Sequence, residues 1–101
     1  MANTFKALFR GAAATGSTTL YTVPASTTCM ITSILVVNTS ATNQTYSLSL
    51  NGVSIATTVP IGANNTALLE IKQVLATTQT ITGLASATSV NFHISGLEIT
   101  P

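Results

Sequence analysis

The chain has 101 residues, and only 5% of them are charged, whereas an ordinary soluble domain carries roughly 25%. Its cations are Lys6, Arg10 and Lys72, its anions are Glu70 and Glu98, and its formal net charge is +1. A basic surface for nucleic acid is therefore excluded, because such a surface needs many clustered Lys and Arg side chains. A net charge near zero instead favours self-association.

The length is that of one domain, and the 46% of apolar residues are enough to form its core. The abundant polar residues are Thr, Ser and Asn. Because the β-branched Thr, Val and Ile suit a pleated sheet better than a helix, the composition predicts a folded all-β protein.

Residues 4–10 form the first candidate element. Phe5, Leu8 and Phe9 have helical spacing, but Phe5, Ala7 and Phe9 alternate as in a strand, which the all-β setting favours. A flexible linker follows, up to residue 17. Two interpretations stay open: residues 1–17 are an arm outside a β-sandwich domain of residues 18–101, or they hold the first strand of the sandwich. An arm could dock by adding a strand to a neighbour's sheet. Its docking residues would be Phe5, Lys6, Leu8, Phe9 and Arg10.

Residues 18–23 predict a strand that ends at Pro24, and residues 29–38 predict the next strand. In the second of these, residues 34–37 are apolar on both alternations, as in a central strand that is covered on both faces. Cys29 lies in an apolar run and is predicted to be a buried core residue. As the only cysteine, it excludes an internal disulfide and a multi-cysteine metal site.

A hairpin is predicted for residues 45–59. Residues 45–50 and 53–59 alternate as strands, and Asn51-Gly52 joins them. Asn-Gly is the strongest short-range hairpin pattern, since both residues accept the positive φ of a type I′ turn. Pro60 is expected to end the second strand.

Three further strands are predicted in the last third of the chain. Residues 67–74 alternate between apolar side chains and the charged Glu70 and Lys72, and residues 78–82 form a short strand that Gly83 ends. Residues 89–99 predict one long bent strand. Its apolar phase slips by one residue at Ser95-Gly96, which indicates a β-bulge there.

The pattern as a whole is seven or eight short strands separated by turn residues. It predicts a single-domain, all-β, antiparallel β-sandwich or jelly-roll-like barrel. Tyr21 and Tyr46 are expected to be buried. The core is predicted to contain Ile34, Val36, Leu48, Ile55, Ile71, Phe92 and Ile94.

Candidate catalytic groups are few. His93 alternates with Phe92 and Ile94 and is expected to face solvent, and Glu70 and Glu98 are expected to be solvated outward residues. The chain has no Asp, no clustered metal ligands and no glycine-rich phosphate loop. We therefore expect no enzymatic activity, metal or cofactor. The N-terminus lacks a secretory signal, and no apolar run has the length of a membrane span, so no membrane partner is expected.

Four segments resemble small all-β structural proteins of tailed bacteriophages. They are Thr19–Ala25 (Thr-Leu-Tyr-Thr-Val-Pro-Ala), Ile34–Ser40, Tyr46–Gly52 and Val90–Ile99, and together they make up 31 of the 101 residues. The family pattern often has Gly in the turn after Pro-Ala, where this chain has Ser26.

The resemblance implies a virion component that is assembled in the host cytoplasm. The leading hypothesis is a capsid decoration (cement) protein, which binds the major capsid protein or other virion proteins and forms a homo-oligomer, a dimer or trimer. A tail, fibre or connector subunit and a carbohydrate-binding or adhesin-like β module remain alternatives. The resemblance supplies no catalytic residues.

Overall fold

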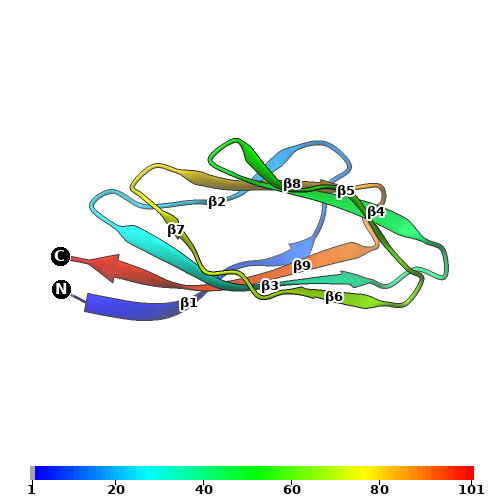
Figure 1. Cartoon of the computed structure of the whole chain (residues 1–101), viewed down its shortest axis with the longest axis horizontal. Helices are drawn as coiled ribbons and strands as arrows, with labels where there is room; N and C mark the ends of the chain where they lie inside the picture. Colours follow the sequence, from blue (N-terminus) through cyan, green and yellow to red (C-terminus); the bar gives the residue numbers. More distant parts are fainter. Residues whose placement is uncertain (1) are drawn as a thin grey trace.

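The computed structural model describes residues 2–101, which form nine β-strands in two antiparallel sheets (Figure 1). The strands are β1 (Ala2–Ala12), β2 (Thr18–Thr22), β3 (Thr28–Asn38), β4 (Gln44–Leu50), β5 (Val53–Ile61), β6 (Thr66–Leu69), β7 (Gln73–Leu75), β8 (Thr80–Ala85) and β9 (Val90–Thr100). The prediction of an all-β antiparallel sandwich is confirmed.

The topology is that of one long hairpin rolled up on itself. Its tip is the turn Asn51-Gly52, where both residues have positive φ (51° and 77°), as the sequence predicts. Moving outward from this tip, β4 pairs with β5, β3 with β6 and β7, β2 with β8, and β1 with β9. Rolling adds the pairs β3–β9 and β4–β8. This winding is a jelly roll, so the structure selects that form among the predicted ones.

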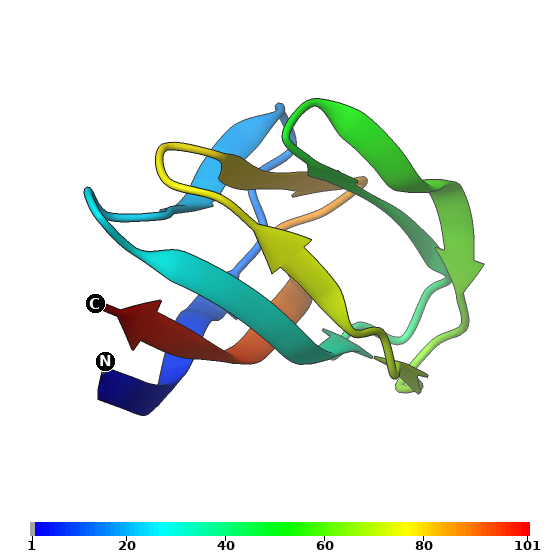
Figure 2. The ribbon, with the colours of Figure 1, turned by 60° about the vertical axis from the view of Figure 1, so that its left-hand side comes forward.

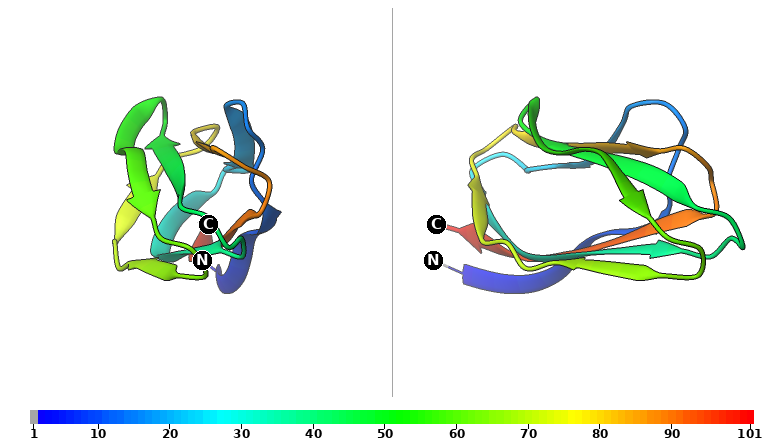
Figure 3. Two further views of the ribbon diagram at one scale, coloured as in Figure 1. Left: turned by 90° about the vertical axis from the view of Figure 1, so that its right-hand side faces the viewer. Right: turned by 45° about the vertical axis from the view of Figure 1, so that its right-hand side comes forward.

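The two sheets pack face to face and are seen edge-on in Figure 1. The five-stranded sheet has the order β1-β9-β3-β6, with β7 also paired to β3, and the four-stranded sheet has the order β2-β8-β4-β5. Figure 2 shows β7 beside β3. The start of β1 and the end of β9 lie together at one end of the sandwich (Figure 3).

Three predicted strand boundaries are wrong. Pro60 lies inside β5, which continues to Ile61; β5 is an edge strand, where a residue without an N–H is tolerated. Gly83 lies inside β8 and does not end it. Glycine is needed there for close packing, because a Cβ would come within 2.9 Å of Leu48 Cδ2. The strand predicted at 67–74 is interrupted at residues 70–72 and becomes β6 and β7, which gives nine strands.

The core between the sheets agrees largely with the prediction. Phe92 from the five-stranded sheet packs edge-on against Tyr46 from the other sheet, with ring centroids 6.5 Å apart. Tyr21 is also buried, and so is Cys29. Five of the predicted core residues are buried as expected, namely Ile34, Val36, Leu48, Phe92 and Ile94.

The other two predicted core residues are not buried. Ile55 is 38% exposed, because it is unpaired at a register shift in β5 that places Ala56 opposite Leu48. Ile71 is partly buried at the rim of the core, in the gap between β6 and β7.

The predicted bulge at Ser95-Gly96 lies on the neighbouring strands, not on β9. Gly96 pairs with Lys6 of β1 and Ile31 of β3, and the unpaired extra residues at this level are Leu8 and Thr32. The reason is steric: a Cβ at Gly96 would come within 2.6 Å of Met30 O and 2.8 Å of Leu8 Cδ1. Atoms of β3 and β1 therefore pack directly against Gly96, while the side chains of β9 keep their alternation.

Candidate assembly surface

The outer face of the five-stranded sheet carries a row of apolar side chains across four strands. Phe5 lies opposite Leu97, Leu97 opposite Met30, and Met30 opposite Val74. Phe5 is 85% exposed and Val74 is 64% exposed, and both are on edge strands. We call this surface, with the second row described next, the apolar face.

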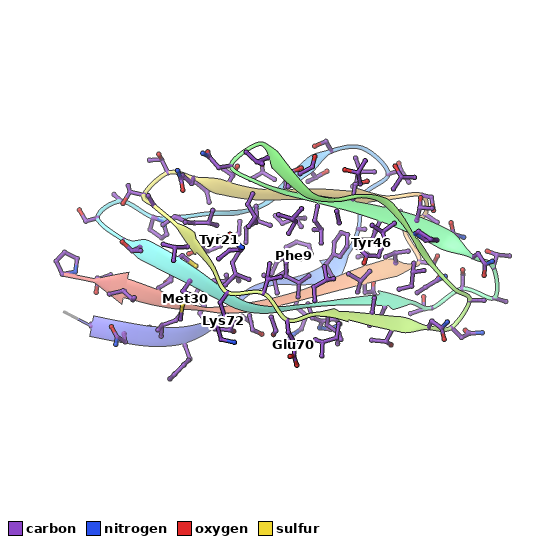
Figure 4. All side chains as sticks on the ribbon, in the orientation of Figure 1. Phe9, Tyr21, Met30, Tyr46, Glu70 and Lys72 are labelled. Atoms are coloured by element: carbon purple, nitrogen blue, oxygen red, sulfur yellow. The ribbon has the colours of Figure 1, made fainter. Side chains whose placement is uncertain are left out.

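A second row crosses the same face four to six residues further along the strands. Arg10 lies opposite His93, His93 opposite Leu35, and Leu35 opposite Leu68, which is 55% exposed. Between the two rows, at the gap between β6 and β7, the exposed Glu70 and Lys72 point away from the sandwich (Figure 4). The few charges of the apolar face thus lie along its two edges.

The outer face of the four-stranded sheet has a different chemistry. Its pairing places Thr19, Thr82, Ser49 and Ser54 in one row and Thr22 opposite Thr80 in another. Leu84, opposite Ser47, is an apolar exception. We call this surface the hydroxyl face. Its composition suits a sheet face that is exposed to solvent.

The central strand β3 is covered on one face only, contrary to the prediction. Ile34 and Val36 are fully buried between the sheets, whereas Leu35 and Val37 are half-buried on the outside. The prediction failed because a two-layer sandwich of residues 2–101 provides no third layer over this sheet. The residues that made β3 look doubly buried are those of the apolar face.

The sequence contains a second indication of this face, the change of apolar phase at Leu97 and Ile99. That change alone predicts a bulge in β9. In the structure β9 keeps its alternation, so these two residues point outward with Ser95 and His93. Periodicity does not reveal Met30, Leu68 and Val74, because only strand register shows that they adjoin Leu97 and Leu35.

All four sheet edges are irregular. β1 has an unpaired residue at Leu8, β2 at Leu20, and β5 at Ile55 and again at Thr57 and Thr58, while the remaining edge is broken between β6 and β7. Bulges and breaks of this kind oppose the addition of a further strand. The faces are therefore more favourable contact surfaces than the edges.

The N-terminal segment is a strand of the sandwich, β1, which pairs with β9 from Ala2 to Ala12. Its candidate docking residues do not lie together on one surface. Leu8 and Phe9 pack against the core, as Figure 4 shows for Phe9, whereas Phe5 and Arg10 lie on the apolar face. A docking role for this segment stays a prediction.

Lys6 belongs to a polar cluster at one end of the sandwich. The Tyr21 hydroxyl donates a hydrogen bond to Glu98 Oε2, and Lys6 Nζ lies 3.4 Å from the same oxygen. Burial, and then the hydrogen bond to Glu98, raise the pKa of Tyr21 above its ordinary value of 10.0. Burial likewise raises the pKa of Cys29 above 9.0.

The prediction that Glu98 is a solvated outward residue is therefore wrong. Its side chain is only 14% exposed and lies on the inner face of β9, in phase with Phe92 and Ile94. The cluster connects β2 of the four-stranded sheet to β9 and β1 of the five-stranded sheet. It therefore links the two sheets.

The other candidate groups lie apart from one another. His93 is half-exposed on the apolar face, and Glu70 is exposed at the edge. In the part of the chain that the structure describes, no pocket is found, and no three His, Cys, Asp or Glu side chains come together. Nor do residues 2–101 include a helix with the length and apolar character to cross a membrane.

Comparison with known proteins shows the fold. No protein-family model matches the chain, and no curated protein does. A chain in the crystal structure of the T13 IBDV viral particle is similar over 95% of this chain and 30% of its own length, with 11% identity and a TM-score of 0.58. The Agl-KA catalytic domain matches over 90% of this chain and 21% of its own, with 17% identity and a TM-score of only 0.40. The chain therefore spans less than a third of either chain, and the first similarity shows that its fold also occurs in a viral particle.

Proposed function

We propose that the protein is a structural component of a tailed-phage virion, most specifically a capsid decoration protein that binds the assembled head and stabilises it. The observation that carries this proposal is the apolar face, an uncovered surface on a compact jelly roll with almost no charge. Jelly rolls also form lectin and cupin domains, so the fold alone does not decide the function.

Decoration requires binding and no chemistry. A protein that binds only the assembled lattice stabilises it by mass action, in proportion to its affinity and concentration. Apolar burial supplies such affinity without charged groups, which fits a chain with five charged residues. The proposed partners are the major capsid protein and further copies of this chain, and the proposed location is the virion.

The carbohydrate-binding alternative is supported less well. Such modules stack sugars on exposed aromatic rings, but Tyr21 and Tyr46 are buried and their rings lie between the sheets (Figure 4). Phe5 is the exposed aromatic side chain, and it lies in an apolar row with few polar groups beside it.

The test compares particles with and without the protein. Particles that lack it should assemble but release their genome at a lower temperature, and added purified protein should restore the wild-type release temperature. Met30→Thr on the apolar face should restore it less well, whereas the control Thr82→Ser on the hydroxyl face should restore it fully.

Two outcomes would contradict the proposal. If the protein is absent from purified particles, the virion role is wrong. If particles without it are equally robust but fail to adsorb to cells, a tail or adhesin function replaces decoration.

A further inference from the structure

We infer that the apolar face binds a second copy of the same chain, in a face-to-face dimer whose two-fold axis is perpendicular to the strands and passes through the level of Ser95. This inference rests on the proposed use of the apolar face for assembly. It assigns that face to the contact between two copies, so that the dimer would contact the head through its remaining surface.

The size of the face is sufficient for a dimer. Strands β1, β3 and β9 have 11 residues each. At about 3.3 Å per residue and about 4.8 Å between strands, four such strands cover on the order of 700 Å². A stable interface of standard size buries about 600–1,000 Å² on each partner, and the area of the face lies within that range.

The arrangement of the rows is symmetric about Ser95. The row through Leu97 lies on one side of it and the row through His93 on the other, and both neighbours of β9 have their bulges at this same level. A two-fold axis at Ser95 therefore places each row over the other row of the second copy. Met30 then faces Leu35, and Val74 faces Leu68, so that apolar side chains cover each other on β3 and at the β6–β7 edge, while Leu97 faces His93 on β9.

The charges at the edges match under the same rotation. Glu70 and Lys72 are placed symmetrically about residue 71, which lies in the gap between β6 and β7. Each therefore faces the opposite charge in the second copy, at two equivalent places. On the other edge, Arg10 faces the exposed ring of Phe5, which is a favourable cation–π arrangement. Among residues 2–101 the only ion pair is Lys6–Glu98, so Arg10, Glu70 and Lys72 are not engaged within the chain.

Alternative modes of self-association fit less well. The irregular edges of both sheets oppose pairing by strand addition. The hydroxyl face would have to lose water from rows of Thr and Ser side chains without gaining apolar contacts. A two-fold axis along the strands would place Glu70 and Lys72 over the uncharged Ala7.

The test uses exchange of the two edge charges. Glu70→Lys and Lys72→Glu each place like charges opposite each other in the homodimer, and each should raise the dimer dissociation constant about tenfold or more. The double variant E70K/K72E restores opposite charges with an unchanged net charge and should dimerise like wild type. Sedimentation equilibrium measures all four proteins.

Mixing the two single variants is the decisive measurement. In their heterodimer one copy carries lysine at both positions 70 and 72, and the other copy carries glutamate at both. Each of the two contacts then joins opposite charges, so a mixture of the two weakly associating proteins should dimerise with near wild-type affinity. Failure of the mixture to associate, or unchanged dimerisation of the single variants, overturns the proposed orientation.

A monomeric wild-type protein at about 100 µM overturns the inference of a second copy. The proposed function is judged separately, by the particle assay. If the protein is monomeric but Met30→Thr still weakens stabilisation of particles, the apolar face binds another virion protein. If the dimer forms but the protein is absent from particles, the dimer stands and the virion role fails.

Discussion

The two outer faces of the sandwich differ although the two sheets contribute to one core. Away from the bulges, every second side chain of a strand points inward, and on both sheets most of these side chains are apolar. The outward side chains are mostly Thr and Ser on the hydroxyl face but include Phe5, Met30, Leu97 and Val74 on the apolar face. The hydroxyl face shows what folding and solubility require. The apolar face exceeds that requirement, and this excess is the reason that we propose it as a contact surface.

The largest expected effect tests the part that the two sheets share. Phe92→Ala should lower the free energy of unfolding by about 3–5 kcal/mol, because Phe92 is fully buried and joins the sheets through Tyr46. Its neighbour on the outside provides the control. His93→Ala should change stability by less than about 0.5 kcal/mol. Urea denaturation at concentrations where the protein is monomeric measures both; similar values for the two would mean that inner and outer positions of β9 do not differ.

The next effect concerns Gly96, which lies between the bulges of its two neighbouring strands, β1 and β3. Gly96→Ala should cost about 1–3 kcal/mol, since the new Cβ would meet the backbone oxygen of Met30 at 2.6 Å. Gly16→Ala is the matched control, because nothing lies within 4 Å of a Cβ there, and its effect should be under about 0.5 kcal/mol. Thermal unfolding distinguishes the two; a neutral Gly96→Ala would show that the bulges at Leu8 and Thr32 have another cause.

Loss of the hydrogen bond in the polar cluster at one end of the sandwich should lower stability by about the same amount or less. Tyr21→Phe should cost about 1–3 kcal/mol, because the shielded Glu98 carboxylate loses the hydrogen bond from the Tyr21 hydroxyl and keeps only Lys6 as a partner. The spectrum of the folded protein should change little, since the aromatic ring at position 21 is retained. A variant as stable as wild type would show that this hydrogen bond contributes nothing.

Tyr21 also makes the free energy of unfolding depend on pH in the alkaline range. The folded state raises the pKa of Tyr21, so its contribution is complete below the unfolded value of about 10 and is lost as the pH rises further. Cys29 and Tyr46, whose pKa values burial also raises, act in the same direction. Wild-type stability should therefore fall from about pH 9 upward, and less steeply in Tyr21→Phe. Equal slopes in the two proteins would contradict this assignment.

The smallest effect on stability compares the two outer faces directly. Met30→Thr and Thr82→Val exchange the character of one central position on each face, and each should change monomer stability by no more than about 1 kcal/mol, because Thr and Val both suit strands. Self-association should weaken only for Met30→Thr. If both variants, or neither, change the dissociation constant, the distinction between the faces has no consequence for assembly.

The predicted strands are accurate where the chain pattern is local. The hairpin at Asn51-Gly52 and the buried alternate residues of β3, β4 and β9 follow from turn chemistry and from a period of two. Errors arise at Pro60, Gly83 and residues 70–72, where the neighbouring strand decides whether a residue that breaks local structure is tolerated. Ser26 is a separate case: it adopts φ 56° in the turn where the resembled family often has Gly.

The sequence by itself determined that this protein is an all-β sandwich with almost no charge, because composition and alternation are properties of adjacent residues. Only the tertiary structure decided where Glu98 lies and which side chains form the apolar face. Glu98 is drawn inward by Tyr21, which is 77 residues away, and Phe5, Leu97, Met30 and Val74 come from four strands to form one row. Such rows depend on the register between strands that are distant in the chain. Alternation along one strand shows that a side chain points outward, but only register shows which side chains it adjoins.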